Sequence, residues 1–236
     1  MKIIAYRSYN DIDIYFEKYN WTKYNAKLHH FLDGNVSCPY EKRIFNVGFM
    51  GEYDFSNEDI NMVKNAKKKW RNMLRRAYDI CYKEKNYTYE NCYVCEEWHN
   101  FSNFYKWYKE NYYEIKNEKM ELDKDILFKG NKIYSSETCI FVPHRINVMF
   151  IKNKKNKGKL PTGVTEHNGK LEVRCTNEKK ERIIIGYFRI NQITEAFMCY
   201  KNFKEKIIKR LADEYKELIP IKLYEAMYKY EIEIND

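Results

Sequence analysis

The residues best suited to chemistry in this chain are two aspartates that flank a lysine. Asp123 and Asp125 lie on either side of Lys124, near a predicted turn. Two carboxylates at one turn can share a Mg²⁺ ion, with water completing the octahedral shell. His144 follows a short predicted strand and could act as a general base. Alternatively, the aspartates cap the turn or pair with Lys124, and His144 is an ordinary surface or hydrogen-bonded histidine.

A cysteine pair suggests a second type of site. Cys92 and Cys95 have the C-x-x-C spacing of a structural zinc site. Cys38 or Cys139 could complete such a site, and His99 could replace one cysteine. No second C-x-x-C or paired histidine motif is present, so buried thiols in a small core are the alternative. Seven cysteines at irregular spacing fit the reduced thiols of a cytoplasmic protein better than a disulfide framework.

Positive charge is concentrated in the middle of the chain. The 236 residues include 43 Lys+Arg and 34 Asp+Glu, for a net charge of +9. Residues 64–76 and residues 152–159 are basic runs without an acid, whereas residues 211–236 are mainly acidic. Basic side chains that neutralise DNA phosphates release condensed counterions. Two basic runs on either side of one aromatic-rich segment therefore indicate a phosphate backbone as the partner, in preference to a solvated face or a linker. The residues expected to bind DNA in these runs are Lys67, Lys68, Lys69, Arg71, Arg75, Arg76, Lys154, Lys155 and Lys157.

Two arginines in the last third of the chain are candidates for base recognition. Arg174 and Arg182 fall at outward positions of predicted strands, with Lys170 and Lys179 close by. Arginine can form two hydrogen bonds to a guanine edge, whereas lysine more often contacts phosphates. The alternative is an ordinary solvated sheet face.

Composition excludes several classes of protein. A hydrophobic fraction of 44%, with 17% aromatic residues, is enough to build cores and argues against a disordered chain. No apolar run reaches the roughly 18 residues of a membrane span, and the N-terminus lacks an apolar signal region. We therefore expect a soluble cytoplasmic protein with no membrane partner.

Hydropathy and turn signals predict an α+β fold in five segments. Residues 1–43 form a small β-module, with a hairpin over residues 2–16 and a third strand over residues 24–31. Residues 44–151 form a central α/β core with two helices. The remaining segments are a basic linker (152–160), a sheet-helix module (161–219) and an acidic extension (220–236) that could add a short helix and strand.

Helical spacing defines the two helices of the central core. Ser56 and Asp59 resemble a capping box, and a following apolar stripe comprises Trp70, Met73, Leu74, Ala77, Tyr78 and Cys81. A second helix is expected to begin near Glu96. Its aromatic residues are interpreted as core because their spacing explains them without base stacking. They are Trp98, Phe101, Phe104 and Trp107.

The remaining predicted elements lie closer to the candidate sites. A strand or turn is expected over residues 122–126, and a strand over residues 139–142 precedes a helix that begins after Pro143. The sheet-helix module has strands over residues 162–166, 170–175 and 182–188. A long helix follows and ends before Pro220.

The order of short motifs resembles a known family. These motifs are W-x-x-M-L-x-R from Trp70, V-C-E-E-W-x-x-F-x-x-F from Val94, L-D-K-D-I from Leu122 and G-N-K-x-Y-S-x-E-T-C-x-F-V-P-x-x-I-N from Gly130. In this order they resemble bacteriophage and mobile-element proteins described as HNH-type or homing-endonuclease-like. The block from Pro161 to Lys201 resembles the AP2-like DNA-binding module often fused to them. Residues Ile3 to Tyr40 also resemble the N-terminal β-module of such proteins.

The resemblance implies a ββα nuclease core delivered to duplex DNA by a basic surface and a three-stranded sheet. Asp123 and Asn147 would hold one Mg²⁺ or Mn²⁺ ion. Lys124 stands where the family has its catalytic histidine, and Thr138 stands where it has an asparagine. Lysine is a poor base at neutral pH unless burial lowers its pKa. The resemblance therefore implies slow, metal-dependent nicking of DNA.

Two functions follow from these observations. The first is a phage-type protein that binds double-stranded DNA and has a weak or altered metal-dependent nuclease activity. The second is a catalytically inactive protein that blocks a host protein or ribonucleoprotein, such as a phage counter-defence inhibitor. The acidic extension supports the second function, since it would repel DNA and could face a basic protein.

Overall fold

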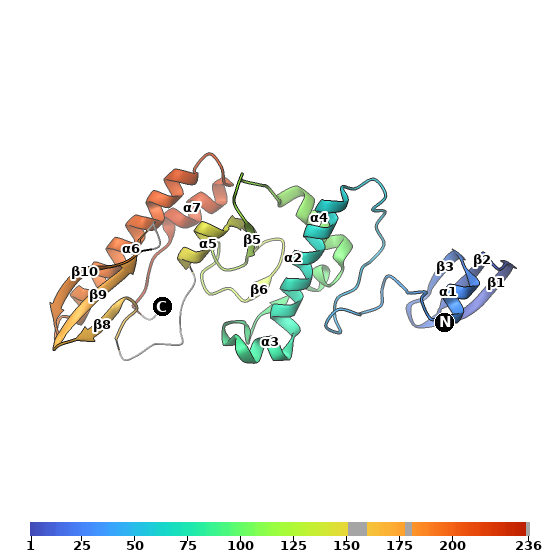
Figure 1. The fold of residues 1–236 in the computed structure, drawn as a ribbon, viewed down its shortest axis with the longest axis horizontal. Coiled ribbons are helices and arrows are strands. Elements are labelled where there is room, and N and C mark those ends of the chain that lie inside the picture. The colour runs from blue at the N-terminus through green and yellow to red at the C-terminus, as the bar shows by residue number, and fades with distance from the viewer. Residues whose placement is uncertain (151–159, 178–180, 235–236) are drawn as a thin grey trace. The chain divides into compact units, whose positions relative to one another are not determined.

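The protein has a mixed α+β architecture, as the sequence predicts. The computed structural model describes residues 1–150, 160–177 and 181–234. Within these ranges the chain divides into two compact units, Met1–Tyr112 with Lys132–Thr138 and Tyr113–Asn131 with Cys139–Asp236. Residues of the predicted 44–151 core occur in both units. Figure 1 shows the order of the elements along the chain.

The described strands and helices are as follows. The strands are β1 (Lys2–Ser8), β2 (Asp11–Phe16), β3 (Trp21–Ala26), β4 (Tyr93–Val94), β5 (Met120–Asp123), β6 (Ile133–Tyr134), β7 (Ile140–Pro143), β8 (Val164–His167), β9 (Lys170–Thr176) and β10 (Arg182–Arg189). The α-helices are α1 (Leu28–Leu32), α2 (Ile60–Tyr78), α3 (Ile80–Lys85), α4 (Phe101–Asn111), α5 (His144–Phe150), α6 (Ile193–Tyr215) and α7 (Ile221–Lys229).

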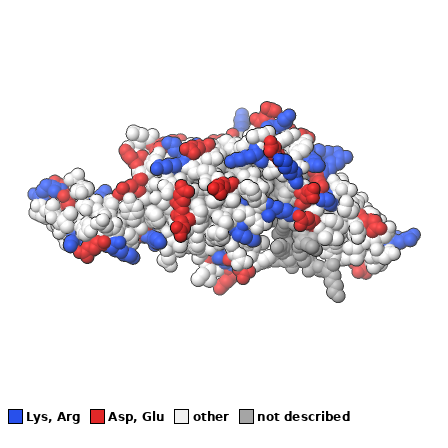
Figure 2. All heavy atoms as spheres, turned by 180° about the vertical axis from the view of Figure 1, so that it is seen from behind, with Lys and Arg blue, Asp and Glu red and all other residues white. Residues whose placement is uncertain are grey.

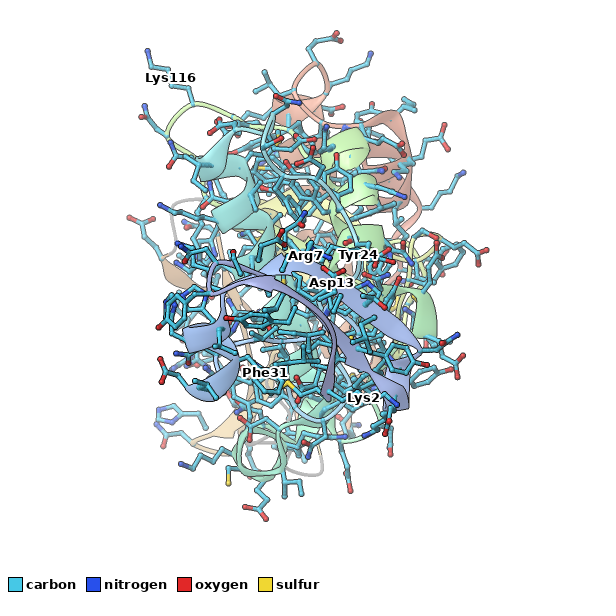
Figure 3. The ribbon with its side chains drawn as sticks, turned by 90° about the vertical axis from the view of Figure 1, so that its right-hand side faces the viewer. Lys2, Arg7, Asp13, Tyr24, Phe31 and Lys116 are labelled. Carbon is cyan, nitrogen blue, oxygen red and sulfur yellow. The ribbon has the colours of Figure 1, made fainter. Side chains whose placement is uncertain are left out.

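The N-terminal module is a three-stranded antiparallel sheet in the order β1-β2-β3, as predicted. Ile12 and Ile14 lie on its buried face. On the other face Arg7 forms ion pairs with Asp11 and Asp13, and Figure 3 shows Arg7 and Asp13 side by side. These pairs neutralise the acids that alternate with the buried isoleucines.

The predicted third strand over residues 24–31 is wrong in its second half. β3 ends at Ala26, and Leu28–Leu32 form the short helix α1. Leu28 and Phe31 both pack against the core of the module. Their separation of three residues suits a helical turn, whereas a strand would point them to opposite faces.

The first predicted helix is α2, whose ends differ from the prediction. Asp59, not Ser56, is its N-cap, since the Asp59 carboxylate accepts a hydrogen bond from the Asn61 N–H at 2.8 Å. The helix ends at Tyr78 with Asp79 as its C-cap, and Asp79 also caps α3 by accepting from the Tyr82 N–H. Cys81 therefore lies in α3 and is exposed, so it is not part of the buried stripe of α2.

The predicted aromatic core is confirmed. Trp98, Phe101, Phe104 and Trp107 are buried, although Trp98 belongs to a short 3₁₀ helix (Glu96–His99) that precedes α4. The Trp70 indole N–H of α2 donates to the Trp98 carbonyl at 2.7 Å. This buried hydrogen bond ties α2 to the segment that leads into α4.

The second unit combines a two-stranded sheet, a three-stranded sheet and three helices. β5 pairs antiparallel with β7, and α5 follows β7 directly. β8, β9 and β10 form the predicted three-stranded antiparallel sheet, and α6 packs on one face of it. The acidic extension forms α7, and the predicted final strand is absent from the described residues 230–234.

A close contact between Gly163, just before β8, and α6 leads to a prediction about this glycine. This glycine has a φ of +83°, and a Cβ atom added to it would lie 2.1 Å from the Tyr200 ring of α6. Gly163→Ala is therefore expected to destabilise the second unit by about 2–4 kcal/mol, through backbone strain and a steric clash together. Urea denaturation followed by circular dichroism measures this change.

Gly169 provides the matched control, since its φ is +72° and no atom lies within 4 Å of an added Cβ. Gly169→Ala should lose only the conformational part, about 1 kcal/mol. Equal losses in the two variants would show that the Tyr200 contact adds nothing.

Candidate nucleic-acid interface

Strand pairing places a row of basic residues on one face of the C-terminal sheet. His167, Lys170 and Arg189 are partners across β8, β9 and β10, so they share one face. Thr165, Glu172 and Tyr187 form the next row on that face. The same face continues with two further pairs across β9 and β10, which are Arg174 opposite Ile184 and Thr176 opposite Arg182. Among the described residues of the three strands, this face therefore presents four Lys or Arg side chains and one acid.

The other face of the sheet is closed by α6. Leu171 and Val173 of β9 are buried there together with Ala196 of the helix. The period of two in β9 alternates these apolar residues with Lys170, Glu172 and Arg174. The basic face is consequently the one that α6 leaves uncovered.

The single acid on the basic face is already paired. Glu172 is buried, and its carboxylate accepts a hydrogen bond from the Arg174 side chain. This bond with Arg174 lowers the pKa of Glu172, so the carboxylate remains ionised and bound. Arg174 is thus partly engaged, whereas Arg182 and Arg189 are exposed.

Sequence reasoning selected Arg174 and Arg182 but did not select Arg189 or Tyr187. Tyr187 is 60% exposed on the same face, next to the exposed Ile184. Alternation along β10 places Arg189 on the outward face only when the bulge between Ile184 and Gly186 is taken into account. That irregularity reverses the alternation within β10, and the sequence does not mark it.

The second basic surface is the exposed side of α2. Lys64, Lys68, Arg71 and Arg75 are all exposed and recur at spacings of four, three and four residues. Such spacing puts the four side chains in one row along the helix. Trp70, Met73 and Leu74 are buried on the opposite side. Of the predicted residues, Lys68, Arg71 and Arg75 belong to this exposed row, which also includes Lys64.

The other predicted residues of this run lie differently. Lys67 and Lys69 are half-buried. Arg76 is half-buried too, with its guanidinium 5.5 Å from the centre of the Tyr89 ring. Arg75 lies 4.5 Å from the Tyr82 ring centre but remains exposed. Arg76 therefore serves packing within the first unit.

Lys154, Lys155 and Lys157 of the predicted basic linker lie outside the described residues. On the face of the molecule in Figure 2, blue basic and red acidic side chains are interspersed. The basic surfaces are therefore defined by the positions of particular side chains on a sheet or helix and not by the overall charge.

The predicted catalytic aspartate Asp123 caps a turn. Its Oδ1 atom accepts hydrogen bonds from the backbone N–H groups of Asp125 and Ile126, at 2.9 and 2.7 Å. Lys124 is buried and donates to Asp125 and to the Asn131 carbonyl, at 3.1 and 3.0 Å. These contacts match the structural alternative for the Asp-Lys-Asp segment.

The environment of Asp123 predicts an unusual dependence of stability on pH. Burial, with a contribution from Asp125, raises the pKa of Asp123 to about 6. The folded protein then binds a proton that the unfolded chain releases near pH 4, so this group stabilises the fold at low pH. That stabilisation is lost as the pH rises from about 4 through about 6.

Asp123→Asn should remove this dependence. Both turn hydrogen bonds use Oδ1, which asparagine retains, and the buried charge disappears. We expect the variant to be more stable than the parent above pH 7 by on the order of 2 kcal/mol, with little difference near pH 4. Thermal unfolding from pH 4 to 8 tests this, and a variant that is less stable at pH 7.5 would contradict it.

His144 and Asn147 are brought together by a residue that sequence reasoning missed. Glu121 of β5 lies 3.1 Å from the His144 Nδ1 atom and accepts a hydrogen bond from the Asn147 carboxamide. The backbone N–H of His144 donates to the Lys119 carbonyl at 2.8 Å. Glu121 precedes Asp123 by two residues of β5, so the two side chains share one face of the strand. The structure therefore brings His144 and Asn147 together at Glu121, and among the described residues neither side chain forms a hydrogen bond with Asp123.

The cysteine pair is partly buried. Cys92 is buried, Cys95 is half-buried, and burial raises the pKa of the Cys95 thiol. His99 lies 2.9 Å from the Tyr78 hydroxyl, so its Nε2 atom has a partner. Across the described part of the chain, no group of three or more His, Cys, Asp or Glu could hold a metal ion. The seven cysteines, all within the described ranges, are thiols.

Comparison of the chain with protein-family models, curated proteins and solved structures finds no match. None of the helices in the described ranges combines the length and the apolar character needed to cross a membrane. The assignment of function therefore depends on the two basic surfaces themselves.

Proposed function

We propose that this protein binds double-stranded DNA through the basic face of the β8-β9-β10 sheet, with the exposed row of α2 as a second contact. The observation that carries the proposal is the strand register, which gathers Lys170, Arg174, Arg182 and Arg189 on the face that α6 leaves uncovered. Arginine and lysine on a sheet can contact phosphates, and the major groove is wide enough to admit strands.

The chemistry of this face suits DNA better than it suits an acidic protein. Exposed Tyr187 and Ile184 lie between the cationic side chains, where they can contact base edges and thymine methyl groups. The one carboxylate that would repel phosphates is buried and paired with Arg174. The resemblance of Pro161 to Lys201 to an AP2-like module agrees with this proposal.

Nuclease activity is not part of the proposal. The Asp123 Oδ1 atom accepts two turn hydrogen bonds, and Asn147 is bound to Glu121. The acidic extension likewise gives no support to a role as an inhibitor of a basic protein. Within this extension Glu225 pairs with Lys229, and Glu233 pairs with Lys129. These acids therefore serve contacts within the second unit.

Salt-dependent binding tests the proposal. For a labelled 20-base-pair duplex, we expect the double variant Arg182→Ala, Arg189→Ala to reduce the affinity by roughly 10-fold or more. Its slope of log affinity against log salt should fall by about 1.8, or 0.9 for each phosphate that is no longer neutralised. Fluorescence anisotropy between 50 and 200 mM salt measures both quantities.

The matched control removes the same charge from exposed positions of α7. Lys222→Ala with Lys229→Ala should leave the slope nearly unchanged. If both double variants reduced the slope equally, the sheet face would have no special role, and absence of duplex binding by the parent protein would overturn the proposal.

A further inference from the structure

A row of asparagines lies beside the cationic row of α2. Asn61, Asn65 and Asn72 are exposed, at spacings of four and seven residues. At about 100° per residue, this row is rotated by roughly 70° from the row of Lys64, Lys68, Arg71 and Arg75. The exposed side of α2 therefore presents carboxamides and cations in parallel rows.

These carboxamides are available for binding. Among the described residues, no hydrogen bond to the side chain of Asn61, Asn65 or Asn72 is seen; the Asn61 contact with Asp59 uses the backbone N–H. Asparagine is a poor helix former, and three on one exposed face do nothing for the stability of α2. No acid occurs anywhere in the helix. A partner with negative charge and paired donors and acceptors would complement this face.

Duplex DNA has both properties. A carboxamide can donate to N7 of adenine and accept from its N6 amino group in the major groove, which is wide enough for an α-helix. At about 1.5 Å per residue, Asn61 and Asn65 are separated by roughly 6 Å along the helix, and Asn65 and Asn72 by roughly 10 Å. These separations correspond to about two and three base-pair steps of 3.4 Å.

We propose that α2 lies in the major groove and reads adenine through Asn65 and Asn72, with Asn61 at the end of the row. The cationic row contacts the adjacent phosphate backbone. The chain should consequently prefer A·T-rich duplexes. This inference rests on the proposed function, because it assigns base recognition to a helix of a protein proposed to bind DNA.

Substitution within the DNA tests the inference directly. We compare two duplexes of one A·T-rich sequence, with adenine or with 7-deazaadenine, which lacks the N7 acceptor but leaves the minor groove unchanged. The parent protein should bind the 7-deaza duplex more weakly, by about 5- to 150-fold for each adenine that a carboxamide reads. The variant Asn65→Ala, Asn72→Ala should bind both duplexes equally.

A matched variant controls for the removal of two exposed carboxamides. Asn57→Ala with Asn91→Ala removes exposed asparagines outside α2 and should retain the full response to 7-deazaadenine. Circular dichroism of all variants checks folding, and alanine at exposed helix positions favours the helix.

The outcomes separate this inference from the proposed function. If the parent protein binds duplexes in a salt-dependent way but does not distinguish adenine from 7-deazaadenine, α2 is not a base-reading helix and the proposed function stands. The same conclusion follows if the Asn65, Asn72 variant retains the discrimination. A preference for duplex RNA, whose major groove is too narrow for a helix, would overturn both the inference and the proposed function. If no duplex is bound at all, both proposals fail.

Discussion

Removal of three exposed cations from α2 is expected to weaken duplex binding by roughly 10- to 100-fold at low salt. Lys64, Lys68 and Arg71 are exposed and lie in one row, so each can contact a phosphate. Converting all three to alanine should reduce the salt slope by about 2.7, since each phosphate contact contributes about 0.9. Anisotropy titrations at several salt concentrations give the slope.

The N-terminal module supplies a control with the same change in charge. Lys18, Lys23 and Lys27 are exposed lysines of that module. Their triple alanine variant should keep a slope close to that of the parent. A slope unchanged by the α2 variant would remove this helix from the interface, whereas the sheet face could still bind.

Trp70→Ala is expected to produce the largest loss of stability. Trp70 is fully buried, its ring centre lies 5.3 Å from that of Phe101, and its N–H donates to the Trp98 carbonyl. Deletion of a buried indole costs about 3–5 kcal/mol, and the unpaired carbonyl adds about 1–3 kcal/mol. Such a loss is comparable to the whole stability of many domains, so we expect the first unit to unfold or nearly so.

A graded series separates packing from hydrogen bonding in this prediction. Trp70→Phe retains much of the packing and should lose about 1–3 kcal/mol. Trp21→Ala, at a half-buried position, should lose less than Trp70→Ala. Urea denaturation gives the free energies of unfolding, and a loss below about 1 kcal/mol for Trp70→Ala would contradict the assigned core.

Several elements of the fold could be predicted because they depend on local periodicity. The spacing of Trp70, Met73, Leu74 and Ala77 defines the buried side of α2, and turn residues between apolar runs separate β8, β9 and β10. The burial of the aromatic residues of α4 follows from the same periodicity. These patterns lie within about 20 residues of chain, so neighbours in sequence determine them.

Element boundaries could not be predicted with the same success, since they depend on individual hydrogen bonds. Asp59 and Ser56 are both suitable caps, and only the structure shows that Asp59 accepts the Asn61 N–H. Asp79 ends one helix and begins the next, which removes Cys81 from the predicted stripe. Residues 28–32 form α1 and do not extend β3, because Leu28 and Phe31 both pack against the core of the N-terminal module.

The sequence by itself determined which residues carry charge and which helix and sheet present them: the acid-free run in α2 and the alternation in β9 are properties of short segments. Only the tertiary structure decided the partners of individual side chains. It paired Glu121 with His144 and Asn147, assigned Asp123 to a turn, placed Arg76 against Tyr89, and aligned Arg189 with Lys170. These contacts join segments that are distant in the chain, or depend on how a turn or bulge closes, so their energies arise only after the segments have packed.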